Sequence, residues 1–248
     1  MKIACSSAGF ADEFAAGTLT QLEWLDACAN ELEMDGVVCD LADFPRTDDQ
    51  YLAQVKKTAT DLGLTIAAIA DRAFFASAVE AEPGAIDVAT ALGAPIAIAS
   101  ASARNDGADA WGDFTAVASA RARAAKRANV TIAVRAARGT VCTTGADLKR
   151  LTKDVDSSWL RYVYAIDDVD LAASDSIRAK SVIAWHDISS CATFATPADS
   201  EAPSLVAGLT RFRGFVVLAG AQPTANRTGY HDAIARFATL RTERLAHA

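Results

Sequence analysis

The sequence predicts a single (β/α)8 barrel that spans residues 1–248. Three observations carry this prediction. The length is close to the roughly 250 residues typical of one such barrel. Short apolar runs alternate with longer amphipathic stretches, eight times at about 30 residues per unit, as expected for repeated right-handed β–α–β crossovers. The apolar runs are continuous rather than alternating, which is typical of parallel strands buried on both faces.

The expected strands are short runs rich in Val, Ile and Ala. They cover residues 2–6, 36–39, 65–69, 95–99, 131–134, 160–166, 181–185 and 214–218. Helical periodicity predicts helices over residues 19–32, 48–62, 84–92, 111–128, 146–155, 171–180 and 231–245. Thr18 is the expected N-cap of the first helix, and Gln21 three residues later fits a capping box. The segment 189–203 shows little periodicity, and a loop of that length suits a lid or a binding loop.

An open, doubly wound sheet is the structural alternative. No G-x-G-x-x-G motif follows the first expected strand, which argues against a dinucleotide-binding sheet. Hydrophobic residues make up 51% of the chain, enough to fill one large core. No linker rich in Pro, Gly or Ser divides the sequence, so we expect one domain.

Charge and composition exclude several kinds of partner. The net charge of −7 argues against a nucleic-acid-binding protein, which needs concentrated Lys and Arg. The five cysteines form no C-x-x-C pair, so we expect neither a disulfide framework nor a zinc site. No signal peptide is apparent, and no apolar run reaches the roughly 18 residues that span a bilayer. We expect a soluble, cytoplasmic protein with a small polar ligand and no membrane partner. Assembly into a homo-oligomer is compatible with the sequence.

Six local patterns, taken in order, resemble the sugar phosphate isomerase/epimerase family, the xylose-isomerase-like barrels. They lie at residues 1–7, 32–38 (LEMDGVV), 62–66 (LGLTI), 91–95 (ALGAP), 129–134 (NVTIAV) and 158–161 (SWLR). The resemblance covers residues 1–220. It implies a divalent metal such as Mn or Mg, held by carboxylates and a histidine at the C-terminal ends of the strands. Such a metal polarises a sugar carbonyl while carboxylates move a proton between adjacent carbons.

Most positions that the resemblance assigns to metal ligands carry other residues. Arg135 stands at the strand-five Glu position, Ala184 at the strand-seven His position and Ala219 at the closing Glu position. Val38 stands at the strand-two Glu position, and only Asp167, at the strand-six Asp position, is retained. Arginine has no lone pair to donate and brings its own positive charge. We therefore expect a metal-independent protein with no cofactor.

His186 and Asp167 are the expected catalytic residues. His186 follows strand seven, where an imidazole can transfer protons near neutral pH, and Asp167 or Asp187 can orient it. Arg135 and Asp167 end adjacent strands about 4.8 Å apart, so their side chains can pair. Either this pair only replaces the positive charge of the missing metal, or Arg135 binds an anionic substrate. The residues expected to bind substrate are Arg135, Asp187, Asp71, Arg72, Arg104 and Trp185.

Two functions remain open from the sequence. One is a metal-independent enzyme that performs isomerase-like or lyase-like proton transfer on a small polar or anionic, sugar-like substrate. The other is a non-catalytic ligand-binding module, or an inactive subunit of an isomerase-like complex. Cys142 has no histidine predicted beside it, so we do not expect a nucleophilic cysteine.

Overall fold

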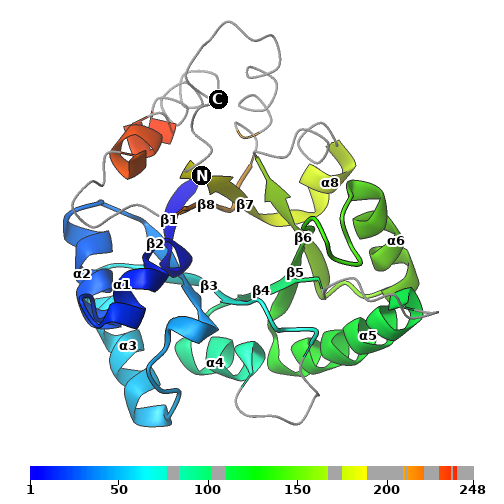
Figure 1. Ribbon diagram of the computed structural model, residues 1–248, viewed down its shortest axis with the longest axis horizontal. Coiled ribbons are helices and arrows are strands. Elements are labelled where there is room, and N and C mark those ends of the chain that lie inside the picture. The colour runs from blue at the N-terminus through cyan, green and yellow to red at the C-terminus, as the bar shows by residue number, and fades with distance from the viewer. Residues whose placement is uncertain are drawn as a thin grey trace, which may run out of the picture.

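Eight parallel strands close into a barrel in the order β1 to β8, and β8 returns to pair with β1 (Figure 1). The structure is a computed structural model that describes residues 1–76, 84–101, 110–166, 175–188, 209, 212–220, 229–235 and 237–238. Every strand pairs in parallel with its neighbours in sequence. The closed barrel confirms the predicted fold class and excludes the open-sheet alternative.

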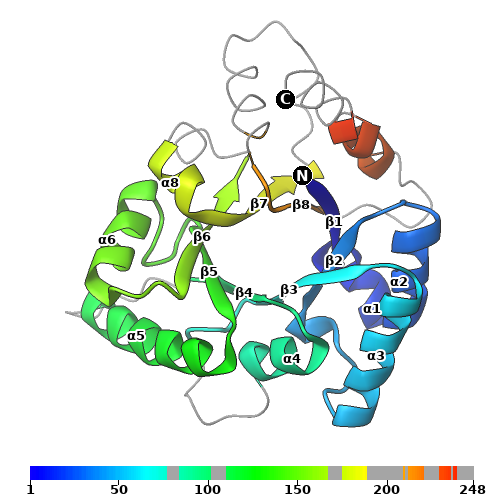
Figure 2. The ribbon, with the colours of Figure 1, turned by 180° about the vertical axis from the view of Figure 1, so that it is seen from behind.

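The strands lie close to their predicted positions, and the helices surround them (Figure 2). The strands are β1 Lys2–Ser6, β2 Gly36–Asp40, β3 Thr65–Asp71, β4 Ile96–Ser100, β5 Thr131–Arg135, β6 Leu160–Ala165, β7 Ser181–Asp187 and β8 Phe215–Ala219. The helices are α1 Ala11–Ala16, α2 Gln21–Asn30, α3 Asp49–Asp61, α4 Ala85–Leu92, α5 Ala110–Ala128, α6 Gly145–Val155 and α8 Asp175–Lys180. Two 3-10 turns, η1 Ser7–Phe10 and η2 Leu41–Asp43, follow β1 and β2. No helix in the described part of the chain is long and apolar enough to cross a membrane.

The first long helix and its N-cap each begin two residues later than predicted. Thr20, not Thr18, caps α2: its hydroxyl accepts from the Glu23 backbone N–H, and the Glu23 carboxylate accepts from the Thr20 N–H at 2.8 Å. A carboxylate at the third helical position closes a stronger box than the Gln21 amide, because the bond is charge-assisted. The residues before it form η1 and α1, where the sequence predicted no helix.

The buried strand residues divide between two clusters that lie on opposite faces of the barrel wall. The outer cluster joins strand residues to helix residues. The inner cluster contains strand residues alone and fills the barrel: Ala4, Val38, Ala67, Ala68, Ala70, Ile98, Ala133, Val163, Ile183, Trp185, Val217 and Ala219. Membership alternates along each strand, as side chains of a β-strand must. Ala67 and Ala68 are consecutive because the β2–β3 register shifts at Val37/Val38.

Small side chains line much of this barrel interior. Six of the twelve residues of the inner cluster are alanine, whereas branched side chains commonly fill such barrels. Trp185 is the one aromatic residue of the cluster, and it is 5% exposed. A single large ring therefore supplies much of the packing toward the C-terminal end of the barrel.

Candidate functional site

The C-terminal ends of the strands form the mouth of the barrel, where the loops that build barrel active sites begin. Strand alternation places the side chains of Ser6, Asp40, Arg135 and Ala219 on the inner face, along with Trp185. These residues end β1, β2, β5 and β8, and Trp185 lies near the end of β7. The mouth therefore gathers a hydroxyl, a carboxylate, a guanidinium and an indole from separate strands.

Arg135 and Trp185 form the best-defined contact at the mouth. The guanidinium carbon of Arg135 lies 4.6 Å from the centroid of the Trp185 ring, within the range of a cation–π interaction. The two residues come from β5 and β7, which have β6 between them. Layers inside a (β/α)8 barrel are built from alternate strands, so side chains of odd-numbered strands meet at one level. This contact joins two predicted substrate-binding residues.

Asp40 is the buried carboxylate of the mouth, with 4% of its surface exposed. One of its oxygens lies 3.4 Å from Nε of Arg72, and the other accepts from the Ala42 backbone N–H at 3.1 Å. Ser6, also buried, ends β1 with a hydroxyl that has no hydrogen-bond partner among the described residues. An ion pair and an unsatisfied hydroxyl thus lie on the β1–β3 side of the mouth.

A short hydrogen-bond chain connects Asp40 to the loop behind it. The Asp40 backbone N–H donates to Oγ of Ser7 at 2.7 Å, and the Ser7 hydroxyl donates to the Asp43 carboxylate at 2.5 Å. Burial raises the pKa of the Asp43 carboxyl, against the lowering effect of the Ser7 hydrogen bond. The sequence reading missed Ser7 and Asp43, because a hydroxyl and a carboxyl 36 residues apart carry no local motif.

Asp71 and Arg72 follow the same strand but leave it in different directions. Ile69 belongs to the outer cluster and Ala70 to the inner one, so Asp71 faces the helices. Its carboxylate accepts from the Ala73 N–H at 2.8 Å, and burial raises the pKa of this carboxyl. Arg72 reaches Asp40 at the mouth. The structure therefore brings Arg72 to the candidate site and places Asp71 behind the barrel wall.

His186 lies on the outer face of β7. Its ring packs against Phe237 with centroids 5.8 Å apart, and the residue is 3% exposed. The neighbouring Trp185 occupies the inner face, as strand alternation requires. The prediction of His186 as a catalytic residue at the mouth is at odds with this placement, because the imidazole packs in the layer between barrel and helices.

Several other predicted residues have a simpler outcome. Asp187 ends β7 on the same face as Trp185. Asp167 and Arg104 lie outside the described residues, so the predicted Arg135–Asp167 pair stays a prediction. Cys142 is buried, and burial raises the pKa of its thiol to about 12. Its thiol therefore stays protonated at neutral pH, as expected for a structural cysteine.

The side chains at the implied metal positions do not fit a divalent cation. Arg135 and Ala219 face inward, as the resemblance requires of ligands, but neither can donate an electron pair to a metal. The assignment of the strand-seven position to Ala184 is wrong by one residue, since Ala184 belongs to the outer cluster and Trp185 faces inward. In the described ranges no three His, Cys, Asp or Glu side chains lie close enough to share a metal ion.

Fold and site together define a (β/α)8 barrel with an arginine–tryptophan contact and a buried aspartate at the C-terminal ends of its strands. No family model matches the sequence, and no curated protein matches it significantly. Solved structures do match it over nearly the whole chain.

The structural relatives include sugar epimerases. The 3-keto-D-glucoside 4-epimerase YcjR from E. coli is 15% identical, with 98% of this chain and 99% of that chain covered at a TM-score of 0.70. The D-psicose 3-epimerase from Clostridium cellulolyticum H10 is 13% identical, with 92% of this chain and 88% of that chain covered at a TM-score of 0.68. A xylose isomerase domain protein from Alicyclobacillus acidocaldarius is 15% identical, with 98% of this chain and 99% of that chain covered at a TM-score of 0.69. The chain therefore has the xylose-isomerase-like barrel fold, which confirms the resemblance.

Proposed function

We propose that this protein binds a small anionic, sugar-like ligand at the mouth of its barrel, through its own side chains rather than through a divalent metal. The contact between Arg135 and Trp185 is the observation that carries this proposal. A guanidinium that stacks on an indole still presents N–H donors at its edge, and these match carboxylate and phosphate oxygens in pairs. The cation stands where the fold's catalytic metal would otherwise supply positive charge.

The β1–β3 side of the mouth supplies groups for the uncharged part of such a ligand. The Asp40 carboxylate can accept hydrogen bonds from hydroxyls, and the Ser6 hydroxyl, which has no partner within the described part of the chain, can donate or accept one. A ligand with an acid group at one end and hydroxyls at the other would pair with both sides. Sugar acids and sugar phosphates have this chemistry, and sugar epimerases share the fold.

In this proposal the reaction is proton transfer at a carbon next to a carbonyl or carboxylate. Arg135 would stabilise the negative charge that develops on the substrate oxygen, and a carboxylate would take the proton. Asp40 and Asp187 are described carboxylates on the inner face, and Asp40 is the buried one and the first candidate for that role. Asp167, which lies outside the described residues, stays a predicted candidate. The Nε of Arg72 lies 3.4 Å from one oxygen of the Asp40 carboxylate and leaves the other oxygen to the Ala42 N–H.

A non-catalytic binding module is the second candidate function. The observation that favours it is the replacement of reactive groups by inert ones on the inner face. Trp185 and Ala219 face inward near the ends of β7 and β8, where Asp187 is the one reactive group that β7 adds, and the His186 imidazole packs on the outer side. This module would bind the same ligand class and leave it unchanged.

Binding is tested by calorimetry against a panel of aldonic acids and sugar phosphates. Arg135→Met should weaken the best ligand about 10- to 100-fold, because it removes a charge-assisted hydrogen bond worth about 1.5–3 kcal/mol. Arg161→Met is the matched control, since Arg161 lies on the first half of β6 and bonds the Leu160 carbonyl. Equal loss in both variants, or binding that needs added Mn²⁺ or Mg²⁺, would contradict the proposal.

Catalysis is tested by NMR of the bound ligand in D2O. Exchange of a carbon-bound proton that Asp40→Asn abolishes, with binding retained, supports the enzyme. Saturable binding with no exchange supports the module. His186→Leu should leave binding unchanged within about twofold, because the imidazole lies outside the mouth.

A further inference from the structure

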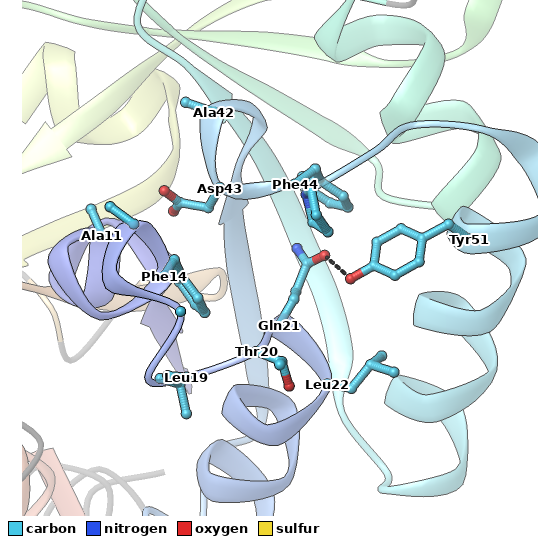
Figure 3. Close-up of a pocket in the computed structure, with 13 residues that line it drawn as sticks. Ala11, Phe14, Leu19, Thr20, Gln21, Leu22, Ala42, Asp43, Phe44 and Tyr51 are labelled. Atoms are coloured by element: carbon cyan, nitrogen blue, oxygen red, sulfur yellow. Dashed lines mark hydrogen bonds between the residues drawn. The ribbon is translucent and has the colours of Figure 1, made fainter.

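A cavity lies beside the barrel mouth, between α1, the start of α2, η2 and α3 (Figure 3). Its volume is about 530 Å³, within the range of roughly 300–1,000 Å³ common for small-molecule sites. Most of the wall is apolar, with Phe14, Leu19, Leu22, Phe44 and Tyr51 among its residues. Polar groups enter from opposite sides: Gln21 from the start of α2 and Asp43 from the end of η2.

Gln21 has an unsatisfied donor at this cavity. The residue is 2% exposed, and its Oε1 accepts from the Tyr51 hydroxyl at 3.2 Å. Its Nε2 is buried with no hydrogen-bond partner among the described residues. Figure 3 shows the amide among the lining side chains, with the nitrogen on the side away from Tyr51. A buried amide N–H without a partner costs about 1–3 kcal/mol, which a ligand acceptor would recover.

The position of this amide is fixed by the local sequence. Gln21 is the first residue of α2, directly after the Thr20 N-cap. The capping box between Thr20 and Glu23 holds the backbone of this turn. The bond to Tyr51, from α3, holds the side chain. The donor is therefore oriented before any ligand arrives, which lowers the entropic cost of binding.

Asp43 sets the charge preference of the cavity. Its carboxylate already accepts from the Ser7 hydroxyl, and the remaining acceptor capacity suits an N–H donor. A ligand carboxylate placed there would meet a like charge in a half-buried setting, which disfavours binding. The cavity thus favours neutral ligands over anions, the reverse of the mouth with Arg135.

We propose that this cavity is a separate binding site for a neutral ligand with an aromatic ring and a primary carboxamide. The ring packs against the apolar wall that includes Phe14, Phe44 and Tyr51. The ligand carbonyl accepts from Nε2 of Gln21, and the ligand N–H donates to Asp43. The site does not depend on the ligand proposed for the mouth, because Arg135 and Trp185 take no part in it.

Benzamide is the probe, and benzoate is the matched control that replaces the amide nitrogen with a charged oxygen. Amide resonances of ¹⁵N-labelled natural protein should shift with benzamide around Gln21 and Asp43, with a Kd on the order of 1 mM, typical of so small a ligand. Benzoate should bind at least about tenfold more weakly. No shift at these residues, or equal binding of benzoate, would overturn the proposal.

Two pairs of variants locate the site. Ala15 lines the cavity from an exposed position on α1, whereas its exposed neighbour Ala16 does not line it. Ala15→Trp should abolish the benzamide shifts and Ala16→Trp should retain them. In a Tyr51→Phe background, where no hydroxyl is left unpaired, Gln21→Met should weaken binding about fivefold. Equal effects of the two tryptophan variants, or no loss from Gln21→Met, would refute the assignment.

Discussion

The contact between Arg135 and Trp185 should contribute measurably to the stability of the barrel. The perturbation is a double-mutant cycle of Arg135→Met and Trp185→Leu, which isolates their coupling from the other interactions of each side chain. The coupling energy should be about 1 kcal/mol, within the range from 0.5 at exposed sites to 2 when desolvated, because Arg135 is half-buried and Trp185 is almost fully buried.

The single change Trp185→Leu should cost more than the coupling. Truncating a buried tryptophan to alanine costs about 3–5 kcal/mol, and leucine restores about a third of the lost atoms. We therefore expect a loss of about 2–3 kcal/mol. The six alanines of the inner cluster have no long side chains with which to fill the space, so the cavity should persist.

Urea unfolding followed by far-ultraviolet circular dichroism measures all four proteins of the cycle. The pair Lys2 and Phe215 is the control, because Lys2 is exposed and its Nζ lies 5.6 Å from the ring at the other end of the barrel. Its cycle of Lys2→Met and Phe215→Leu should give about 0.5 kcal/mol or less. A coupling at Arg135–Trp185 no larger than that of the control would refute the reasoning.

Four further predictions concern other parts of the fold. Gly36→Ala should destabilise the barrel by about 2–3 kcal/mol, because a Cβ there would lie 2.4 Å from the Thr65 carbonyl oxygen. Gly17→Ala, where no atom lies within 4 Å but φ is +67°, should cost about 1 kcal/mol in the same urea experiment. Burial raises the pKa of Asp43 in the folded state, so this group's contribution to stability is lost as pH rises from its unfolded pKa through its folded pKa. The unfolding free energy of Asp43→Asn, relative to natural protein, should therefore increase over that pH interval, and a constant difference would contradict the assignment. Asp147→Ala should lower the unfolding free energy by about 1 kcal/mol. The reason is that the Asp147 carboxylate accepts hydrogen bonds from the backbone N–H of Thr143 at 2.9 Å and of Thr144 at 2.8 Å at the start of α6. A loss of less than a few tenths of a kcal/mol would refute that role.

Local sequence predicted most strand positions of this barrel correctly. β1 matches its predicted range, and β5 differs by one residue at its end. Such agreement is expected because apolar runs bounded by polar residues and glycines mark buried strands directly. The inward position of Arg135 at the end of β5 also followed from the ordered resemblance, and the structure supports it through the contact with Trp185.

The local sequence could not predict which side chains of β7 face into the barrel. Residues 183–186 are all buried, so the strand shows no alternation of polar and apolar residues that would reveal its faces. A shift of one residue reverses every side chain. The assignment of Ala184 and His186 to the inner face therefore had no local check, and the structure places Trp185 there instead.

Composition and periodicity by themselves determined the fold class and the strand positions, and the family resemblance implied that Arg135 and Ala219 stand where metal ligands are expected. Only the tertiary structure decided that Arg135 contacts Trp185, that His186 packs outward against Phe237, and that Gln21 and Asp43 share a cavity. The physical reason is that strand formation depends on neighbouring residues, whereas these contacts depend on barrel closure. Closure brings strands 50 residues apart into one layer, as with Arg135 and Trp185.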